Sequence, residues 1–177
     1  MSRFRRANTG TTFFFTVVAY HRRPILCDLI IRTALRDALY GVRALRPFTI
    51  DAWVLLPDHM HCIWTLPVDD TDFSQRWSQI KHRVSYACGD AYRMRPSVSG
   101  LRRGEATIWQ RRFWEHQIRD DFDMQRHMDY VHFNPVKHGH VERVVAWPYS
   151  TFGRWVKAGL YAADWGGDPA LDGLDFE

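Results

Sequence analysis

FTIDAWVLLPDHMHCIWTL, residues 48–66, carries the clearest structural signal in this sequence. It consists of two apolar runs, 48–56 and 59–66, separated by Pro57 and Asp58. Because proline presets φ and aspartate tolerates turn geometry, this dipeptide predicts a tight turn between two antiparallel strands. A β-hairpin is therefore the element from which the rest of the fold is predicted.

Periodicity and turn residues on both sides of the hairpin predict the remaining elements. In chain order we expect a strand over 11–20, a helix over 28–45 capped by Asp28, the hairpin, a helix over 74–89, a loop over 93–105, a strand over 108–119, a helix from 120 or 121 to 134 that stops before Pro135, and a turn with a short helix over 144–159. Strand, helix, hairpin, helix and strand form the βαββαβ plan of a ferredoxin-like α+β fold. We expect an antiparallel sheet with helices on one face, plus an added helix beyond residue 120.

The composition is that of one globular domain. Of 177 residues, 46% are hydrophobic and 15% aromatic, which is too apolar for a disordered chain. No apolar run approaches the ~18–20 residues that cross a bilayer, and the three cysteines form no CxxC pair. We therefore expect a cytoplasmic protein with no membrane partner, one domain over 1–163 and an acidic tail over 164–177.

Basic charge is concentrated in the body of the chain. Segment 164–177 has five acidic residues and no Lys or Arg, which leaves 24 basic against 15 acidic side chains, net +9, on residues 1–163. Only three of the basic residues are lysines. Guanidinium groups pair with phosphate oxygens and stack on flat rings, so this composition favours a polyanion with exposed bases. An arginine-rich surface that only reflects genome base composition is the alternative.

His59 and His61 begin the second strand of the hairpin and share one of its faces, because side chains alternate along a strand. Two imidazoles about 6–7 Å apart on one strand face can converge on a metal ion. A pair of partly exposed strand histidines with no ligand is the alternative.

The helix predicted to end at residue 134 has two stripes. At ~100° per residue, its apolar core stripe consists of Met124, Met128 and Val131. Its polar stripe consists of Asp123, His127, Tyr130 and Asn134. Tyr130 and Asn134 are neighbours at i and i+4. A tyrosine hydroxyl can act as a nucleophile, and an asparagine oxygen can bind Mg²⁺ or Mn²⁺. A packing role for Tyr130 and a polar helix end at Asn134 are the alternatives.

These motifs resemble a known family. The matching segments are His59-Met60-His61 after the Leu-Pro-Asp turn, WQRRFWEH at 109–116, IRD at 118–120, RH at 126–127, YVHFNPVKHG at 130–139 and WPYST at 147–151. Over roughly residues 10–167, the sequence resembles the REP-associated tyrosine transposases, a branch of the single-tyrosine transposases within the HUH endonuclease superfamily.

The resemblance implies a ferredoxin-like fold and an enzyme that cleaves and rejoins single-stranded DNA beside imperfect-palindrome hairpins. It implies His59, His61 and Asn134 as ligands of a divalent cation, Mg²⁺ or Mn²⁺, and Tyr130 as the nucleophile that forms a 5′-phosphotyrosine without a nucleotide cofactor. Relatives outside this branch have Gln at the position of Asn134, which also offers an amide oxygen. The resemblance leaves a monomer and a homodimer open, and it implies a nucleoid-associated protein.

Other residues are weaker candidates. His127, one turn before Tyr130, is a candidate for assisting proton removal, and an exposed helix histidine or a DNA contact is the alternative. The candidates for binding DNA phosphates are Arg3, Arg5, Arg6, Lys81, Arg102, Arg103, Arg111 and Arg112. Trp109, Phe113 and Trp114 are candidates for stacking on unpaired bases. Two rival functions remain: a non-catalytic nucleic-acid-binding module and a metal phosphodiesterase that uses water.

Overall fold

The computed structural model describes residues 11–94 and 107–167. Its centre is a four-stranded sheet with the order β2-β3-β1-β4, in which every neighbouring pair is antiparallel. The strands are β1 (Thr12–Val18), β2 (Thr49–Leu55), β3 (His59–Thr65) and β4 (Trp114–Gln117). This is the strand order of a ferredoxin-like fold, so the fold class expected from the sequence is confirmed.

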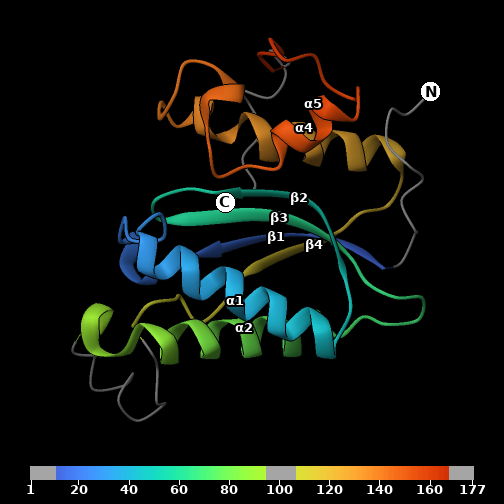
Figure 1. The fold of residues 1–177 in the computed structure, drawn as a ribbon. Coiled ribbons are helices and arrows are strands. Elements are labelled where there is room, and N and C mark those ends of the chain that lie inside the picture. The colour runs from blue at the N-terminus through green and yellow to red at the C-terminus, as the bar shows by residue number, and fades with distance from the viewer. Residues whose placement is uncertain (1–10, 95–106, 168–177) are drawn as a thin grey trace.

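Two long helices, α1 (Leu29–Leu45) and α2 (Phe73–Cys88), cover one face of the sheet (Figure 1). The core between these helices and the sheet is rich in aromatic residues, and the rings of Trp64 and Trp77 stack at 4.2 Å. Met60, Cys62 and Trp64 of β3 all lie in this core. The alternation of side chains along β3 therefore follows the sequence prediction.

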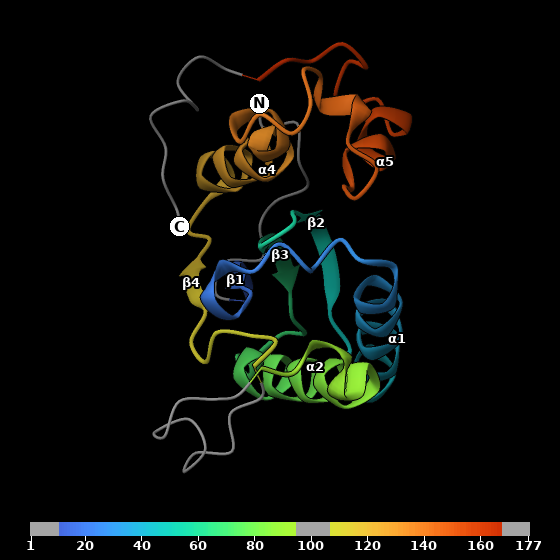
Figure 2. The ribbon, with the colours of Figure 1, turned by 90° about the vertical axis from the view of Figure 1, so that its left-hand side faces the viewer.

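The opposite face of the sheet is covered by α4 (Asp121–Lys137) and α5 (Phe152–Lys157), as Figure 2 shows. Phe14 and Ile63 of the sheet pack against Met128 and Val131 of α4 in a second core. His61 lies on the same face of β3 as Ile63 and contacts α4. The helix that is additional to the minimal plan therefore lies over the histidine face of the sheet.

The C-terminal end of α4 differs from the sequence prediction. The helix does not stop before Pro135 but continues to Lys137. It ends where Gly139 adopts φ 69°, with Gly139 N donating to Val136 O at 2.9 Å and His140 N donating to Pro135 O at 2.9 Å. This is a Schellman arrangement, in which a glycine in the left-handed region terminates the helix. The additional turn places Lys137 Nζ 5.0 Å from the centre of the Tyr130 ring.

Two smaller expectations also need correction. The strand expected over 108–119 is reduced to the four residues of β4, because the apolar residues at its ends, Trp109 and Ile118, are buried outside that strand. Asp28 precedes α1 but makes no side-chain cap, and its carboxylate instead accepts a hydrogen bond from the Tyr92 hydroxyl at 3.0 Å.

Short 3₁₀ helices connect the main elements: η1 (Tyr20–Arg22), η2 (Gly89–Tyr92) and η3 (Val144–Ala146). The turn and short helix expected over 144–159 are observed as η3 and α5. Trp165 packs on Tyr161 at 4.8 Å, and the rest of the acidic tail beyond residue 167 lies outside the described residues. Among the described helices, none is both long and apolar enough to span a bilayer.

Candidate active site

Two elements that are far apart in the sequence meet on the sheet face beneath α4. β3 begins with His59 and His61, and α4 carries Tyr130 and Asn134 one turn apart. The ring centroids of His61 and Tyr130 are 5.2 Å apart, and those of His59 and His61 are 4.8 Å apart. Each of the four residues is at most 1% exposed. The histidines are therefore buried and not partly exposed, and their role as metal ligands stays a prediction.

His59 is oriented by the carboxylate that precedes it. Its Nδ1 lies 2.7 Å from Asp58 Oδ1, and Arg22 lies 3.2 Å from the other carboxylate oxygen. Burial acts to raise the pKa of Asp58, but hydrogen bonds from His59 and Arg22 and the positive charge of Arg22 outweigh it and hold the pKa at about 2. The ionised carboxylate accepts a hydrogen bond from the Nδ1–H group and leaves His59 Nε2 as a ligand atom, as in many metal-binding histidines.

His61 is oriented by a hydroxyl group of the neighbouring strand. Thr16 lies directly opposite His61 in the β1–β3 pairing, and Thr16 Oγ1 is 2.9 Å from His61 Nδ1. Burial, assisted by nearby positive charge such as that of Lys137, holds the pKa of His61 well below its usual range. The imidazole is therefore neutral at physiological pH, which is the form that binds metal ions.

Residues at both ends of α4 define the environment of Tyr130: Asp120 caps its start and Lys137 lies near its end. Asp120 accepts a hydrogen bond from Asp123 N at 2.8 Å, as an N-cap residue does. Near the other end of the helix, Lys137 Nζ lies 5.0 Å from the centre of the Tyr130 ring. A cation at this distance favours an ionised phenol over a neutral one.

The residues of this cluster fit a divalent cation. His61 Nε2 and both polar side-chain atoms of Asn134 are buried, and within the described part of the chain none of them has a hydrogen-bond partner. Buried polar atoms without partners cost roughly 1–3 kcal/mol each, and a bound ion or water is one way to offset that cost. Two imidazole nitrogens and an amide oxygen form a donor set that can hold a divalent cation.

A second group of titratable side chains lies near the start of α4. His116, Asp123 and His127 each place a potential ligand atom within 4.8 Å of the others. However, Asp123 Oδ2 accepts hydrogen bonds from His116 Nε2 at 2.8 Å and from Arg119 Nε at 3.1 Å. A guanidinium at the same oxygen opposes a cation there, so we interpret this group as a hydrogen-bonded network.

This network holds His127, the residue considered for proton removal. His127 Nδ1 is 2.8 Å from the Asp123 carbonyl oxygen, and its ring stacks on His116 at 4.7 Å. Burial lowers the pKa of His127 to about 4. The alternative of an exposed histidine is wrong, since His127 is 2% exposed. The centre of the Phe14 ring lies 4.9 Å from that of His127 and 6.1 Å from that of Tyr130. The role of His127 in removing the Tyr130 proton stays a prediction.

The proposed phosphate-binding residues have different environments. Arg3, Arg5, Arg6, Arg102 and Arg103 lie outside the described residues. Arg111 and Arg112 are exposed before β4.

Lys81 is engaged inside the protein. Its Nζ donates to the Gln110 carbonyl at 2.9 Å and lies 5.3 Å from the Phe113 ring, and burial lowers its pKa to about 8. This geometry favours a structural role for Lys81. Of the aromatic candidates, Trp109 is buried and Phe113 packs against the core, whereas Trp114 is 41% exposed.

Sequence patterns did not identify several residues that orient the cluster. Asp58 could have been noticed because it is next to His59. Thr16 depends on strand register, which the sequence does not reveal. His138, which directly follows the extra helical turn that the prediction omitted, lies with its ring 5.1 Å from that of His59.

Known proteins resemble this chain along nearly its whole length. The REP-associated tyrosine transposase of Escherichia coli is 48% identical over 169 residues, covering 95% of this chain and 93% of the relative. A provisionally named REP-associated tyrosine transposase of Haemophilus influenzae is 42% identical over 177 residues, covering 97% of each. A solved structure of the REP-associated tyrosine transposase bound to a REP hairpin matches with a TM-score of 0.78 at 47% identity, covering 99% of this chain and 95% of that chain. No protein-family profile matches the sequence.

The ferredoxin-like fold and these relatives define the class of the protein, a DNA-processing enzyme of the transposase type. Within that class, the chain belongs to the REP-associated tyrosine transposase family. The resemblance seen in the sequence motifs is thereby confirmed.

Proposed function

We propose that this chain is a metal-dependent, single-tyrosine endonuclease and strand transferase that cleaves and rejoins single-stranded DNA beside REP-like hairpins. The observation that carries the proposal is the 5.2 Å separation of the His61 and Tyr130 rings, with Asn134 one turn further along α4. The proposed nucleophile and the proposed metal ligands thus belong to one buried cluster.

Each side chain of the cluster has a role in the proposed reaction. A cation bound by His59, His61 and Asn134 would supply Lewis-acid polarisation of the phosphodiester and orient it for in-line attack. Tyr130 Oη attacks phosphorus, the bond from phosphorus to the 3′ oxygen breaks, and the products are a 5′-phosphotyrosine and a free 3′-hydroxyl. Because the covalent link conserves the phosphodiester bond energy, attack by another 3′-hydroxyl reverses the step and joins strands without a nucleotide cofactor.

The phenol must lose its proton, since free tyrosine has a pKa near ~10. Lys137, whose Nζ lies 5.0 Å from the ring centre, favours the ionised form. The neutral imidazole of His127 is the candidate proton acceptor, directly or through a water molecule. The positions of both residues support an attack by Tyr130.

The proposed substrate is supported by the relatives and by the basic charge of the body of the chain. The solved relative is bound to a REP hairpin and is 47% identical to this chain. Because the four residues of the cluster are at most 1% exposed, we infer that part of the covering structure moves before a DNA strand reaches Tyr130.

The test is covalent adduct formation with labelled hairpin DNA and Mn²⁺, observed on a denaturing gel. We expect the wild type to form an adduct, and the Tyr130→Phe variant to form none. Tyr86→Phe is the matched control, because Tyr86 is 81% exposed on α2 and far from the cluster in the fold.

Each rival function predicts a different result. An adduct that survives Tyr130→Phe shows that another residue is the nucleophile. Cleavage to free 5′-phosphate products, unaffected by Tyr130→Phe, indicates a phosphodiesterase that uses water. Hairpin binding without any cleavage by the wild type indicates a non-catalytic binding module.

A further inference from the structure

His138 directly follows α4 and lies beside the proposed metal ligands, yet it has no role in the proposed reaction. The centre of its ring is 5.1 Å from that of His59, and the two rings meet at 73°. His138 is exposed, unlike the four residues of the cluster. It therefore lies where the buried cluster meets the solvent.

The backbone of α4 joins His138 to one of the proposed ligands. His138 N donates to the Asn134 carbonyl at 3.0 Å, so the two residues are neighbours at i and i+4. Tyr130, Asn134 and His138 thus follow one another at helical spacing. His138 extends the polar stripe of this helix by one turn, beyond the point at which the sequence prediction ended it.

The distances between the histidine rings are those of imidazoles that share one ion. A metal–nitrogen bond of about 2.0–2.1 Å, with about 1.1 Å more from the nitrogen to the ring centre, places two such ring centres about 4.5–5.2 Å apart. The ring centres of His59 and His61 are 4.8 Å apart, and those of His59 and His138 are 5.1 Å apart. By this measure His138 is as well placed as His61 to share an ion with His59.

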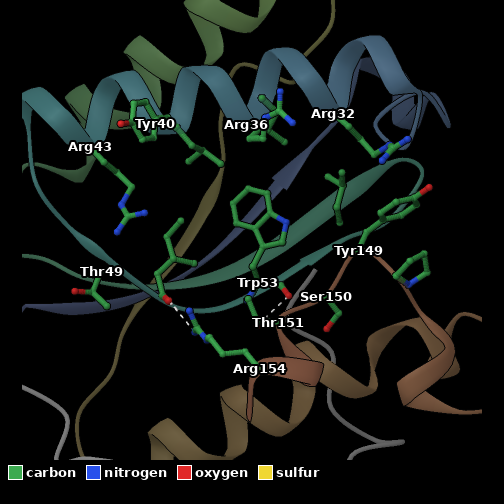
Figure 3. Close-up of a pocket in the computed structure, with 15 residues that line it drawn as sticks. Arg32, Arg36, Tyr40, Arg43, Thr49, Trp53, Tyr149, Ser150, Thr151 and Arg154 are labelled. Carbon is green, nitrogen blue, oxygen red and sulfur yellow. Dashed lines mark hydrogen bonds between the residues drawn. The ribbon is translucent and has the colours of Figure 1, made fainter. Parts of the chain in front are cut away.

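The chain after His138 is fixed to the edge of the sheet. Leu55 N, at the end of β2 and just before the turn into β3, donates to the Tyr149 carbonyl at 2.9 Å. Thr151 N donates to the Trp53 carbonyl at 2.9 Å, in the wall of a cavity between α1 and β2 (Figure 3). His138 is therefore held between the end of α4 and an anchored segment, near the start of β3.

We propose that His138 is a fourth protein ligand of the cation in the DNA-free protein, and that it gives way to a phosphate oxygen when DNA binds. This inference rests on the proposed function, because it adds a residue to the same metal site. No covalent bond changes in this exchange: the lone pair of one imidazole nitrogen is replaced by that of one phosphate oxygen, and nothing is oxidised or reduced.

The surroundings of the ligands explain why His138 is the one that exchanges. His59 is buried, and its Nδ1 lies 2.7 Å from Asp58. His61 is buried too, and its Nδ1 lies 2.9 Å from Thr16. His138 is exposed, so its side chain can turn into the solvent. Since a catalytic metal site needs an open position for its substrate, the departure of His138 provides that position.

A third imidazole also changes which cations the site prefers. Nitrogen ligands bind Co²⁺ more tightly than Mn²⁺, whereas oxygen ligands, water included, suit Mn²⁺. When His138 is removed, water can take its place. Loss of His138 should therefore weaken the binding of Co²⁺ more than the binding of Mn²⁺.

The first experiment measures the affinity of the protein for Co²⁺ and Mn²⁺ by calorimetry, without DNA and after removal of bound metal with EDTA. The variant is His138→Ala. Its matched control is His140→Ala, because His140 is also an exposed histidine and its ring stacks on Trp147 at 5.4 Å. His61→Ala identifies the binding that belongs to the cluster. Urea unfolding of metal-free His138→Ala should match that of the wild type, which excludes a general loss of structure.

We expect His138→Ala to bind Co²⁺ at least ~100-fold more weakly than the wild type, the upper end of the loss that follows removal of an orienting partner. The loss for Mn²⁺ should be smaller, and His140→Ala should bind both ions like the wild type. Equal Co²⁺ affinity of His138→Ala and the wild type would remove His138 from the metal site. If His61→Ala also binds Co²⁺ like the wild type, the cluster holds no metal, and the proposed function itself fails.

The second experiment tests the exchange through the visible absorption of Co²⁺, which changes when oxygen replaces a nitrogen ligand. Tyr130→Phe is used so that hairpin DNA binds without cleavage. We expect DNA to change the Co²⁺ spectrum of Tyr130→Phe, and to change it less when His138→Ala is added, because the nitrogen is then already absent. If DNA binds, as measured by fluorescence anisotropy, and the spectrum stays the same or changes equally in both proteins, His138 does not give way to DNA.

Discussion

The ring of Tyr130 lies 5.2 Å from the ring of His61 at an angle of 67°, and both residues belong to the same chain. Asn134 lies one turn further along the same helix, so the proposed nucleophile and the proposed metal ligands are all contributed by one protomer. A second subunit is not needed to complete this cluster, which favours activity as a monomer.

This relationship predicts that two inactive variants cannot restore each other. Tyr130→Phe retains the metal ligands, and His61→Ala retains the tyrosine. If a tyrosine of one subunit acted with histidines of another, a mixture of the two variants would contain complete sites. We expect adduct formation by the mixture to stay at the level of the separate variants, measured on labelled hairpin DNA with Mn²⁺.

The complementation assay needs a positive control, which is an equal mixture of wild type and Tyr130→Phe. This mixture should give about half of the wild-type signal. Recovery of activity in the mixture of Tyr130→Phe and His61→Ala would show that the cluster of the active enzyme is built between subunits, contrary to the geometry of the single chain.

A second prediction concerns Thr16, whose hydroxyl lies 2.9 Å from His61 Nδ1. Thr16→Val keeps the volume of the side chain but removes the group that orients the imidazole. Loss of such an orienting partner typically lowers metal affinity about 10- to 100-fold. We expect weaker Mn²⁺ binding, measured by calorimetry on the protein without DNA.

Thr12→Val is the matched control, because Thr12 is an equally buried hydroxyl on β1 that bonds to Thr65 instead of a histidine. It should lower stability to a similar extent and leave Mn²⁺ affinity unchanged. Equal Mn²⁺ affinity for Thr16→Val and the wild type would remove Thr16 from the proposed metal site.

The fold was predictable because its signals are local. The alternation of His59, Met60 and His61 along a strand requires no knowledge of the rest of the chain, and neither does the helical spacing of Tyr130 and Asn134. Pro135 misled the prediction of the helix end because its missing N–H was treated as a stop. The actual terminator, Gly139, is a local signal as well, and it was present in the sequence.

The meeting of the two halves of the cluster is a long-range property. No spacing in the sequence indicates that α4 packs over the His59 face of the sheet; the family resemblance alone implied it. The Thr16 contact depends on the register of β1 against β3, and the contact of His138 with His59 depends on where α4 ends. These features follow from tertiary packing, so periodicity could not predict them.

A third prediction concerns stability in acid. Burial lowers the pKa of His127 to about 4 in the folded protein, against about 6.5 in an unfolded chain. Above about pH 6.5 the residue is neutral in both states, and stability is fully retained. As pH falls from about 6.5 to 4, only the unfolded chain gains a proton here, and up to about 3 kcal/mol of the free energy of unfolding is lost.

His127→Asn should therefore reduce the loss of stability over this pH range, measured by urea unfolding at several pH values. The Asn side chain retains an N–H that can donate to the Asp123 carbonyl, so the variant separates titration from loss of the hydrogen bond. His140→Asn is the control. Since His140 is exposed, its replacement should leave the dependence of the free energy of unfolding on pH unchanged. If the free energy of unfolding of His127→Asn depends on pH as steeply as that of the wild type, His127 is accessible to protons in the folded state.

The last prediction concerns Lys137, which the sequence prediction placed beyond the helix and the structure places with its Nζ 5.0 Å from the centre of the Tyr130 ring. The ammonium group favours the negative charge that develops on the phenol oxygen as its proton leaves. Lys137→Met retains the aliphatic stem and removes this charge. We expect adduct formation to slow roughly 10- to 100-fold, and the rate to need a higher pH to reach its plateau.

A shift of the pH profile distinguishes an electrostatic role from a structural one, because a change in packing alone would lower the rate equally at every pH. Lys137→Arg keeps the charge and should retain the wild-type profile. Lys157→Met, at the exposed end of α5, removes the same charge elsewhere and should change neither rate nor profile. If Lys137→Met slows the reaction equally at all pH values, the lysine acts by packing or by holding DNA, and the phenol is ionised by another group.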